Sequence, residues 1–252
     1  MGEPVRVVHI TDCHLTGNEQ DRVGEVDTRA TLAAVLEDME SHPAPDLILA
    51  TGDLSQDGST QSYGRFAGLL AQRGAPVYCL GGNHDAGGAM LAILVRHGLH
   101  LERVLNYGAW FIHLLPTALA GRMGGRVQEA ELEVLDTALR ANRDKHALIC
   151  MHHHPVPVGG SWGEEAGIEN PGELFEVTDR HANLRGFLWG HVHQSFESQR
   201  NGVQMLGTPS TSFDVVSDAQ GHPSIGPPKP GYRRMALHED GTIESEVHWV
   251  NP

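Results

Sequence analysis

The sequence predicts an α/β fold, and three observations support this. Apolar runs without a helical period, such as Leu47–Thr51, are typical of strands buried on both faces of a parallel sheet. These runs alternate with segments whose apolar residues recur at helical spacing. From about residue 195 the pattern changes to short alternating β segments separated by the Gly and Pro residues of 221–231. This C-terminal part predicts a second, partly antiparallel sheet packed against the first, within a single domain over residues 1–252.

Composition limits the class of partner. The chain has 252 residues, 40% hydrophobic and 20% charged, which suits one large domain with a sizeable core. Its 18 Lys and Arg against 32 Asp and Glu give a net charge of -14 without a basic stripe, so we expect no nucleic-acid partner. The sequence shows neither an export signal nor an apolar stretch of about 18 residues, so we expect no membrane partner. Three widely spaced cysteines do not suggest a disulfide framework, and we expect a cytoplasmic protein.

The first predicted strand, Val5–Ile10, leads into a turn that contains Asp12 and His14. An aspartate and a histidine separated by one residue on an extended turn point the same way, which suits two ligands of one cation. Apolar residues at helical spacing over 26–39 predict a helix that crosses back over the sheet.

The second predicted strand, Leu47–Thr51, ends at Gly52 and Asp53. Open α/β sheets build their sites at the carboxyl ends of the strands, where the connecting loops converge. A carboxylate binds through both oxygens, so Asp53 can bridge two cations at this edge. The turn that follows, from Asp57 to Thr60, predicts the N-terminus of a helix that runs to about Gln72.

The third predicted strand, Pro76–Leu80, ends in Gly81-Gly82-Asn83-His84-Asp85. The two glycines permit a tight turn and a close approach of the backbone to a site. Asn83 offers a neutral oxygen ligand, while His84 is a titratable group at the same edge. Beyond it, Leu101–Leu115 predicts a hairpin, and leucines in phase over 128–141 predict a helix.

A further buried strand, Ala147–Met151, ends in three consecutive histidines. The end of the strand favours His152 as a metal ligand, with His153 as the alternative ligand or as part of the substrate pocket. Arg122, in the glycine-rich loop before this strand, is either a surface arginine or a phosphate contact.

A long loop rich in Gly and Pro, residues 156–170, is typical of a lid or a substrate wall. Trp162 within it either stacks on a flat substrate group or packs the loop onto the domain. The next strand, Leu184–Trp189, ends at Gly190 and is followed by His191 and His193. A His-x-His turn can supply ligands to two neighbouring metals.

Every one of these polar groups follows a predicted strand, so the sequence predicts one metal site at the carboxyl edge of the sheet. The set contains oxygen and nitrogen donors without thiolates, which suits Mn, Fe or Zn. Its members are Asp12, His14, Asp53, Asn83, His84, His152, His191 and His193.

This ordered set, Asp-x-His, Gly-Asp, Gly-Asn-His-Asp, His and Gly-His-x-His, resembles the calcineurin-like metallophosphoesterase family over nearly the whole chain. The resemblance implies an α/β fold in which two sheets form a sandwich flanked by helices, with a binuclear metal centre. It also implies that His84 lies by the leaving group. One metal would be held by Asp12, His14, Asp53 and His193, and the other by Asp53, Asn83, His152 and His191.

Within this family the chain is most similar to bacterial class III 3′,5′-cyclic nucleotide phosphodiesterases. The similarity rests on four stretches, Gly52–Asp57, His152–Pro155, Gly207–Ser212, and Pro230–Arg233 before Val247–Trp249. It implies hydrolysis of 3′,5′-cyclic AMP to the 5′-monophosphate by a hydroxide formed on two metals, which lower the pKa of a shared water towards about 7. His84 would assist the leaving oxygen, and Asp57 and Asp85 are alternative acids that could orient it.

Other functions remain alternatives at this point. The same chemistry suits a glycerophosphodiester, a nucleotide-lipid pyrophosphate or a phosphomonoester. An alternative of another class is a non-catalytic scaffold that binds a protein partner. The β-rich C-terminal segment is a candidate homodimer interface, and no sequence feature decides whether it is used.

Overall fold

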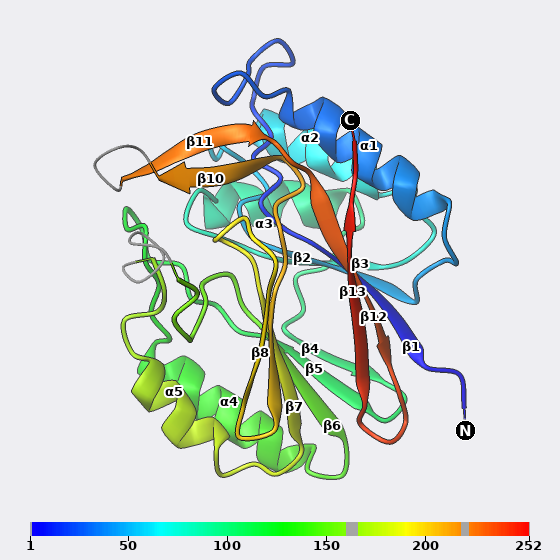
Figure 1. The fold of residues 1–252 in the computed structure, drawn as a ribbon, viewed down its shortest axis with the longest axis vertical. Helices are drawn as coiled ribbons and strands as arrows, with labels where there is room; N and C mark the ends of the chain where they lie inside the picture. Colours follow the sequence, from blue (N-terminus) through cyan, green and yellow to red (C-terminus); the bar gives the residue numbers. More distant parts are fainter. Residues whose placement is uncertain (1, 160–165, 218–221, 252) are drawn as a thin grey trace.

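The computed structural model describes residues 2–159, 166–217 and 222–251, and in them two β-sheets lie face to face with helices on their outer sides (Figure 1). The first sheet has the strand order β13-β12-β1-β2-β3, with β1, β2 and β3 parallel and β12 antiparallel to β1. Its strands are β1 (Val5–Ile10), β2 (Leu47–Thr51), β3 (Val77–Leu80), β12 (Gly231–Leu237) and β13 (Ile243–Trp249).

The second sheet has the order β4-β5-β6-β7-β9-β8, in which β5, β6, β7 and β9 are parallel and the two edge strands are antiparallel to their neighbours. Its strands are β4 (Val104–Tyr107), β5 (Trp110–Leu114), β6 (His146–Cys150), β7 (Leu184–Trp189), β8 (Phe196–Arg200) and β9 (Val203–Gly207). A separate two-stranded ribbon, which projects from one end of the molecule in Figure 1, consists of β10 (Phe213–Ser217) and β11 (Pro223–Pro228).

The helices cover the outer face of each sheet. Helices α1 (Thr28–Glu40), α2 (Thr60–Leu70) and α3 (Gly87–Arg96) lie on the first sheet, whereas α4 (Glu129–Ala141) and α5 (Pro171–Thr178) lie on the second. Asp27 and Ser59 cap the N-termini of α1 and α2, because each side chain accepts a hydrogen bond from a backbone amide three residues on. No helix within the described residues is long and apolar enough to cross a membrane.

Alternation of side chains along the strands divides the core into three layers. In β2, Ile48 and Ala50 face the helices of the first sheet, while Leu47 and Leu49 face the second sheet. The middle layer between the sheets includes Trp110, and a third layer lies between the second sheet and its helices. The prediction that Leu47–Thr51 is buried on both faces is confirmed, since all five residues are buried.

The structure corrects one expectation and adds one helix. The C-terminal part does not form the second sheet by itself, because β12 and β13 extend the first sheet while β8 and β9 complete the second. Strand pairing depends on distant partners, which the local pattern does not reveal. Helix α3, which begins at two glycines and has no side-chain N-cap, was not predicted.

A buried arginine joins the two sheets. Arg233 of β12 is fully buried, donates to Glu197 Oε1 of β8 at 2.7 Å and to the Gly207 carbonyl of β9 at 2.8 Å, and also bonds Ser245 of β13. Strands of both sheets therefore share one guanidinium, whose planar fork suits several acceptors at once.

Candidate metal centre

The loops that follow β1, β2, β3, β6 and β7 meet at one end of the sandwich and bring the predicted polar residues together. The loops after β1 and β2 run side by side, because the Asp12 amide donates to the Gly52 carbonyl at 3.0 Å and the His14 amide to the Asp53 carbonyl at 2.8 Å. The first sheet supplies Asp12, His14, Asp53, Asn83 and His84, and the second sheet supplies His152, His191 and His193.

Five of these residues have left-handed backbone conformations. The φ angles are 54° at Asp12, 47° at His14, 49° at Asp53, 67° at His191 and 57° at His193. Such a conformation costs a residue with a Cβ about 1–2 kcal/mol, and strain of this kind concentrates at functional sites. The expectation that Asp12 and His14 lie on an extended turn is therefore wrong, because the backbone is left-handed at both residues.

Neighbouring glycines permit the close approach of these loops. A Cβ on Gly82 would lie 2.5 Å from the Asp53 amide nitrogen and 2.7 Å from His152 Nε2. A Cβ on Gly190 would lie 2.5 Å from Asp12 Oδ2. Real Cβ atoms do not come so near to other heavy atoms, so only glycine fits at these two positions.

Hydrogen bonds fix the orientation of three histidine rings. The Nδ1 atoms of His14, His152 and His193 lie 2.7 Å from Gln56 Oε1, 2.8 Å from the Thr51 carbonyl and 2.7 Å from the Phe213 carbonyl. Each partner is an oxygen that accepts, so each Nδ1 carries a proton and each Nε2 is left to bind a cation at the centre, either a proton or a metal ion. This arrangement is typical of metal-binding histidines.

The side chain of Asp53 lies near the ring nitrogens of His152 and His14. Its Oδ1 accepts a hydrogen bond from the His84 amide at 2.9 Å, whereas its Oδ2 lies 3.4 Å from His152 Nε2 and 3.8 Å from His14 Nε2. Asn83 Oδ1 is also 3.1 Å from His152 Nε2. The Oδ2 atom of Asp53 is thus placed to contact ions on both sides.

Asp12 shows the same division of its two oxygens. Its Oδ2 accepts from the Thr11 hydroxyl at 2.7 Å and from the His191 amide at 2.9 Å. Its Oδ1 is buried, has no hydrogen-bond partner in the described part of the chain, and lies 3.4 Å from His193 Nε2. One oxygen is fixed by the protein and the other faces the centre.

The electrostatics of this buried cluster favour cations. Burial raises the pKa of Asp53, but the charge and hydrogen bond of His152 outweigh it and hold this pKa well below its usual value. Burial lowers the pKa of His152, but Asp53 and Asp12 outweigh it and raise this pKa to about 9. Two buried carboxylates thus produce a strong negative field, which draws a positive charge onto the neighbouring ring.

The residues present fit a pair of metal ions. The Nε2 atoms of His14 and His193 lie 3.2 Å apart, and both are acceptors once each Nδ1 donates to its oxygen. Two lone pairs at this distance repel each other unless a cation lies between them. Together with the partnerless Oδ1 of Asp12, this contact indicates that the site is built around positive ions with oxygen and nitrogen ligands.

His84 lies at the exposed rim of the centre. Its ring is 5.0 Å from that of His14, edge to face, and its Nδ1 donates to the Gln56 carbonyl at 3.2 Å. The expectation that Asp57 or Asp85 orients His84 is wrong for the described residues, because a backbone carbonyl takes that role.

Both carboxylates instead stabilise loops. Asp85 accepts hydrogen bonds from the amides of Gly82, Leu54 and Ser55 and from the Tyr63 hydroxyl, at 2.9–3.2 Å. It thereby ties the loop after β2 to the loop after β3. Asp57 accepts from the Gly17 and Ser59 amides. Their oxygens are occupied by these donors.

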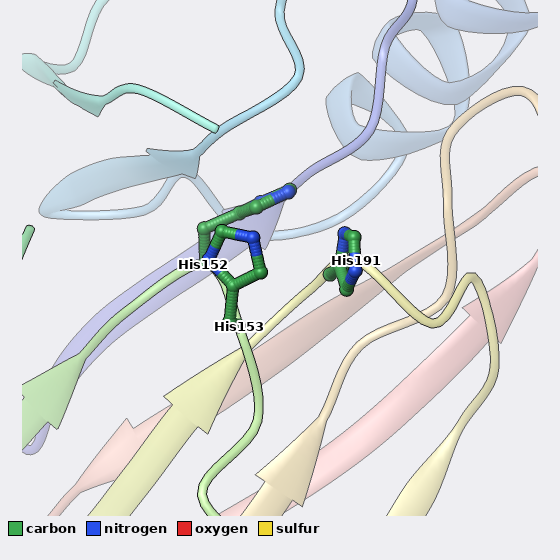
Figure 2. A group of neighbouring side chains, drawn as sticks. All are labelled: His152, His153 and His191. Atoms are coloured by element: carbon green, nitrogen blue, oxygen red, sulfur yellow. The ribbon is translucent and has the colours of Figure 1, made fainter. Parts of the chain in front are cut away.

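Figure 2 shows the rings of His152, His153 and His191 gathered beyond the ends of β6 and β7. The centroid of the His191 ring is 4.9 Å from that of His152 and 4.5 Å from that of His153. Both ring nitrogens of His153 face protein oxygens, Thr117 Oγ1 at 2.8 Å and the Met123 carbonyl at 3.0 Å. His152 therefore fits the role of ligand, while His153 holds the loop that carries Met123.

Arg122 and Trp162 were the remaining candidate contacts with the substrate. Arg122 forms an exposed ion pair with Glu169 and does not line the hollow at the metal centre, as expected for a surface arginine. Trp162 lies outside the described residues. Sequence reasoning missed the roles of Gln56, which lies within the Gly52–Asp57 stretch, and of Phe213, which lies outside the recognised motifs; both contact ligand rings.

The centre opens into a hollow of about 360 Å³. One part of its lining is polar and includes His84, Asn83 and Gln56, and another part is formed by the ribbon of β10 and β11. The volume exceeds what a phosphate group alone needs, so the hollow has room for an organic group attached to a phosphate.

Comparisons with known proteins agree with this geometry. Residues 5–195 match the calcineurin-like phosphoesterase family. The chain is 36% identical over 248 residues to the 3′,5′-cyclic adenosine monophosphate phosphodiesterase CpdA of Pseudomonas aeruginosa, covering 98% of this chain and 90% of that protein. It is 37% identical to CpdA of Escherichia coli K12, covering 97% and 89%.

Solved structures show the same fold. A dimetal phosphatase from Danio rerio superposes with a TM-score of 0.71 at 14% identity, covering 98% of this chain and 99% of that one. The predicted two-sheet α/β sandwich is confirmed, and its strand ends hold the ordered motifs from which the resemblance was drawn. The match over residues 5–195 and the relatives that span nearly the whole chain lead to one conclusion: this protein belongs to the calcineurin-like phosphoesterase family.

Proposed function

We propose that this enzyme is a binuclear-metal phosphodiesterase that hydrolyses 3′,5′-cyclic AMP to 5′-AMP. The observation that carries the proposal is the position of Asp53 Oδ2 between the Nε2 atoms of His14 and His152. Two relatives that match nearly the whole of this chain and are named as cyclic AMP phosphodiesterases support the choice of substrate. We also propose a cytoplasmic location, in keeping with the three free and buried cysteines.

The metal ligands follow from the oriented atoms. We propose that one ion takes Asp12, His14, Asp53 and His193, and the other takes Asp53, Asn83, His152 and His191. When bound, Mn, Fe or Zn ions neutralise the phosphate and make a water acidic enough to act at neutral pH.

The chain's own residues position the substrate and move a proton. His84 donates from Nδ1 to the Gln56 carbonyl, which leaves Nε2 as the ring nitrogen that acts at the rim of the centre, and the imidazolium form of the ring carries the proton to be donated there. From there it donates to the 3′ oxygen as the bond between phosphorus and that oxygen breaks. The water oxygen remains on phosphorus, and the products carry a 3′ hydroxyl and a 5′-phosphate.

The proposal is tested by turnover of cyclic AMP by the manganese-loaded protein, beside bis(p-nitrophenyl) phosphate and p-nitrophenyl phosphate. Efficient release of 5′-AMP is expected. Activity confined to the artificial diester would retain the binuclear chemistry and reject cyclic AMP as the substrate, in favour of a glycerophosphodiester or a lipid-linked pyrophosphate.

A pair of variants separates an enzyme from a scaffold. Asn83→Ala removes a proposed ligand and is expected to abolish most turnover while the protein stays folded. Asn106→Ala removes an exposed amide at the β4–β5 hairpin and serves as the matched control. Equal activity in these two variants would show that the centre is not catalytic.

A further inference from the structure

The ribbon of β10 and β11 presents one apolar face to the hollow beside the metal centre. Val215 lies directly opposite Ile225, so the two side chains share a face of the ribbon. Phe213 is two residues earlier on β10; the register of the ribbon shifts between Phe213 and Val215, but both side chains pack in the same apolar cluster. All three residues line the hollow, together with the catalytic candidates of the two main sheets.

This apolar face begins at the metal centre and extends outward. The Phe213 ring lies 4.8 Å from the ring of His193 and 5.1 Å from that of His14, between centroids. Two residues along a strand correspond to about 7 Å. A phosphate held near His193 therefore has Val215 and Ile225 at a distance comparable to the span from phosphate to base in a cyclic nucleotide.

A tight turn braces the ribbon. Val23 and Val26 exchange two backbone hydrogen bonds of 3.1 Å, and both side chains pack in a small cluster with Phe213 and Val215. Gly24, at the tip of this turn with φ of 58°, is so near the ribbon that a Cβ would lie 3.1 Å from Ile225 Cγ2. The turn thus fixes the position of the apolar face.

Met123 lines the same hollow from a different loop. Its carbonyl accepts from His153 Nε2, which ties this loop to the end of β6. The side chain is 52% exposed, and Ile225 is 47% exposed. A flat ring that covers exposed apolar side chains binds favourably, because it removes apolar surface from water. A methionine sulfur also makes favourable contacts with aromatic rings.

The chemistry of the lining selects among phosphodiesters. Among the described residues that line the hollow there is no lysine or arginine, so its charges lie at the metal centre. The ribbon and the Met123 loop contribute Met123, Val215 and Ile225, together with Pro223 and one polar residue, Ser224. Glycerol and choline-type head groups are polar or charged, so contact with these apolar side chains adds little to their binding. A purine offers a flat, uncharged face that can cover them.

We propose that Val215, Ile225 and Met123 form the subsite for the nucleobase of the substrate, and that this subsite makes the enzyme prefer nucleoside cyclic phosphates to glycerophosphodiesters. The inference rests on the proposed function and names the part of the site that recognises the substrate beyond its phosphate.

The first test compares cyclic AMP with an abasic analogue, the 3,5-cyclic phosphate of methyl β-D-ribofuranoside. Ile225→Ser and Met123→Ser are each expected to raise KM for cyclic AMP about tenfold with kcat nearly unchanged, because each removes one large apolar side chain that the base would cover. Neither change should affect the abasic analogue. Val216→Ser is the matched control, because Val216 is exposed beside Val215 and points to the other face of the ribbon.

A second measurement does not require metals or turnover. Saturation-transfer NMR on the metal-free protein with 5′-AMP is expected to show transfer from protein methyl groups to H2 and H8 of adenine, and Ile225→Ser should reduce it. Melting temperatures of the variants equal to that of the parent protein would show that they remain folded.

The outcomes are distinguishable. If the parent protein hydrolyses cyclic AMP but the variants lose the same activity on both substrates, or lose none, the nucleobase subsite is refuted and the proposed function is retained. If the parent protein does not hydrolyse cyclic AMP, both proposals are refuted. A loss confined to cyclic AMP, with reduced transfer to adenine, supports both.

Discussion

Gln56 offers a direct test of the metal-centre geometry, because it is the only side chain among the three acceptors that orient the rings of His14, His152 and His193. The other two acceptors are backbone carbonyls, which substitution cannot remove. Gln56→Leu deletes the oxygen 2.7 Å from His14 Nδ1 and keeps a side chain of similar size. Gln56→Glu keeps an acceptor at the same place.

The magnitude follows from the burial of His14, which is 3% exposed. A buried N–H left without an acceptor costs about 1–3 kcal/mol. Metal on Nε2 holds His14 in the Nδ1–H form, whereas the metal-free ring can place its proton on either nitrogen, so this cost falls mainly on the bound state. At about 1.4 kcal/mol per factor of ten, the Kd of the ion bound by His14 should rise roughly 10–100-fold. Loss of an outer hydrogen-bond partner of a metal ligand typically has an effect of this size.

The assay is a manganese titration of the metal-free protein against a competing chelator, which resolves the two dissociation constants. We expect Gln56→Leu to weaken one of them, since His14 belongs to one proposed position. Gln56→Glu should restore it, and Gln61→Leu, a change at an exposed glutamine in α2, should alter neither. Unchanged constants in Gln56→Leu, or an equal rise of both, would refute the reasoning.

Three further predictions concern catalysis and stability. His84→Ala should lower kcat about 10²–10⁴-fold, measured with cyclic AMP, while the metal content by elemental analysis stays at the parent value. Burial lowers the pKa of His113 from 6.5 to about 4, so the unfolded chain binds more protons between these values and stability falls as the pH drops through 6.5 towards 4. In the parent protein this titration should lower the unfolding free energy by about 3 kcal/mol between pH 8 and pH 4, and His113→Leu should abolish that contribution when unfolding is measured in urea. The same pH dependence in the variant and the parent would contradict this. Arg233→Met leaves the Gly207 carbonyl without its donor but frees a glutamate that reaches solvent, so unfolding free energy should fall by only about 1–3 kcal/mol; a stabilised variant would argue against this account.

Local patterns predicted the strands that carry the site. Every residue of Leu47–Thr51 is apolar or β-branched, and the structure buries this strand between two layers, as the pattern requires. The pairing partners of β12 were beyond such reasoning, because alternation along Gly231–Leu237 suits either sheet equally. Helix α3 escaped prediction because Gly87 and Gly88 disfavour a helix start, and packing overrides that preference.

The sequence predicted which residues form the candidate site, but not the groups that orient their side chains. Asp53, His152 and the other strand-end groups follow from the rule that parallel strands gather their loops at one edge. The partner of His84 is a carbonyl, which every residue possesses, so no side-chain pattern marks Gln56 as its source. The left-handed backbone at Asp12 was also hidden, because aspartate does not signal that conformation as glycine does.

The division of the proposed ligands between the two sheets has a consequence for the life of the protein in the cell. Neither sheet alone carries a complete set, so ions bind tightly only after both sheets have docked, and binding then favours the folded state. Free metal at 100 times its Kd adds about 2.7 kcal/mol per site. For a chain of ordinary stability this is a large share of the margin against unfolding. A cell starved of the metal would therefore lose the protein to degradation as well as its activity, and abundance would follow metal supply.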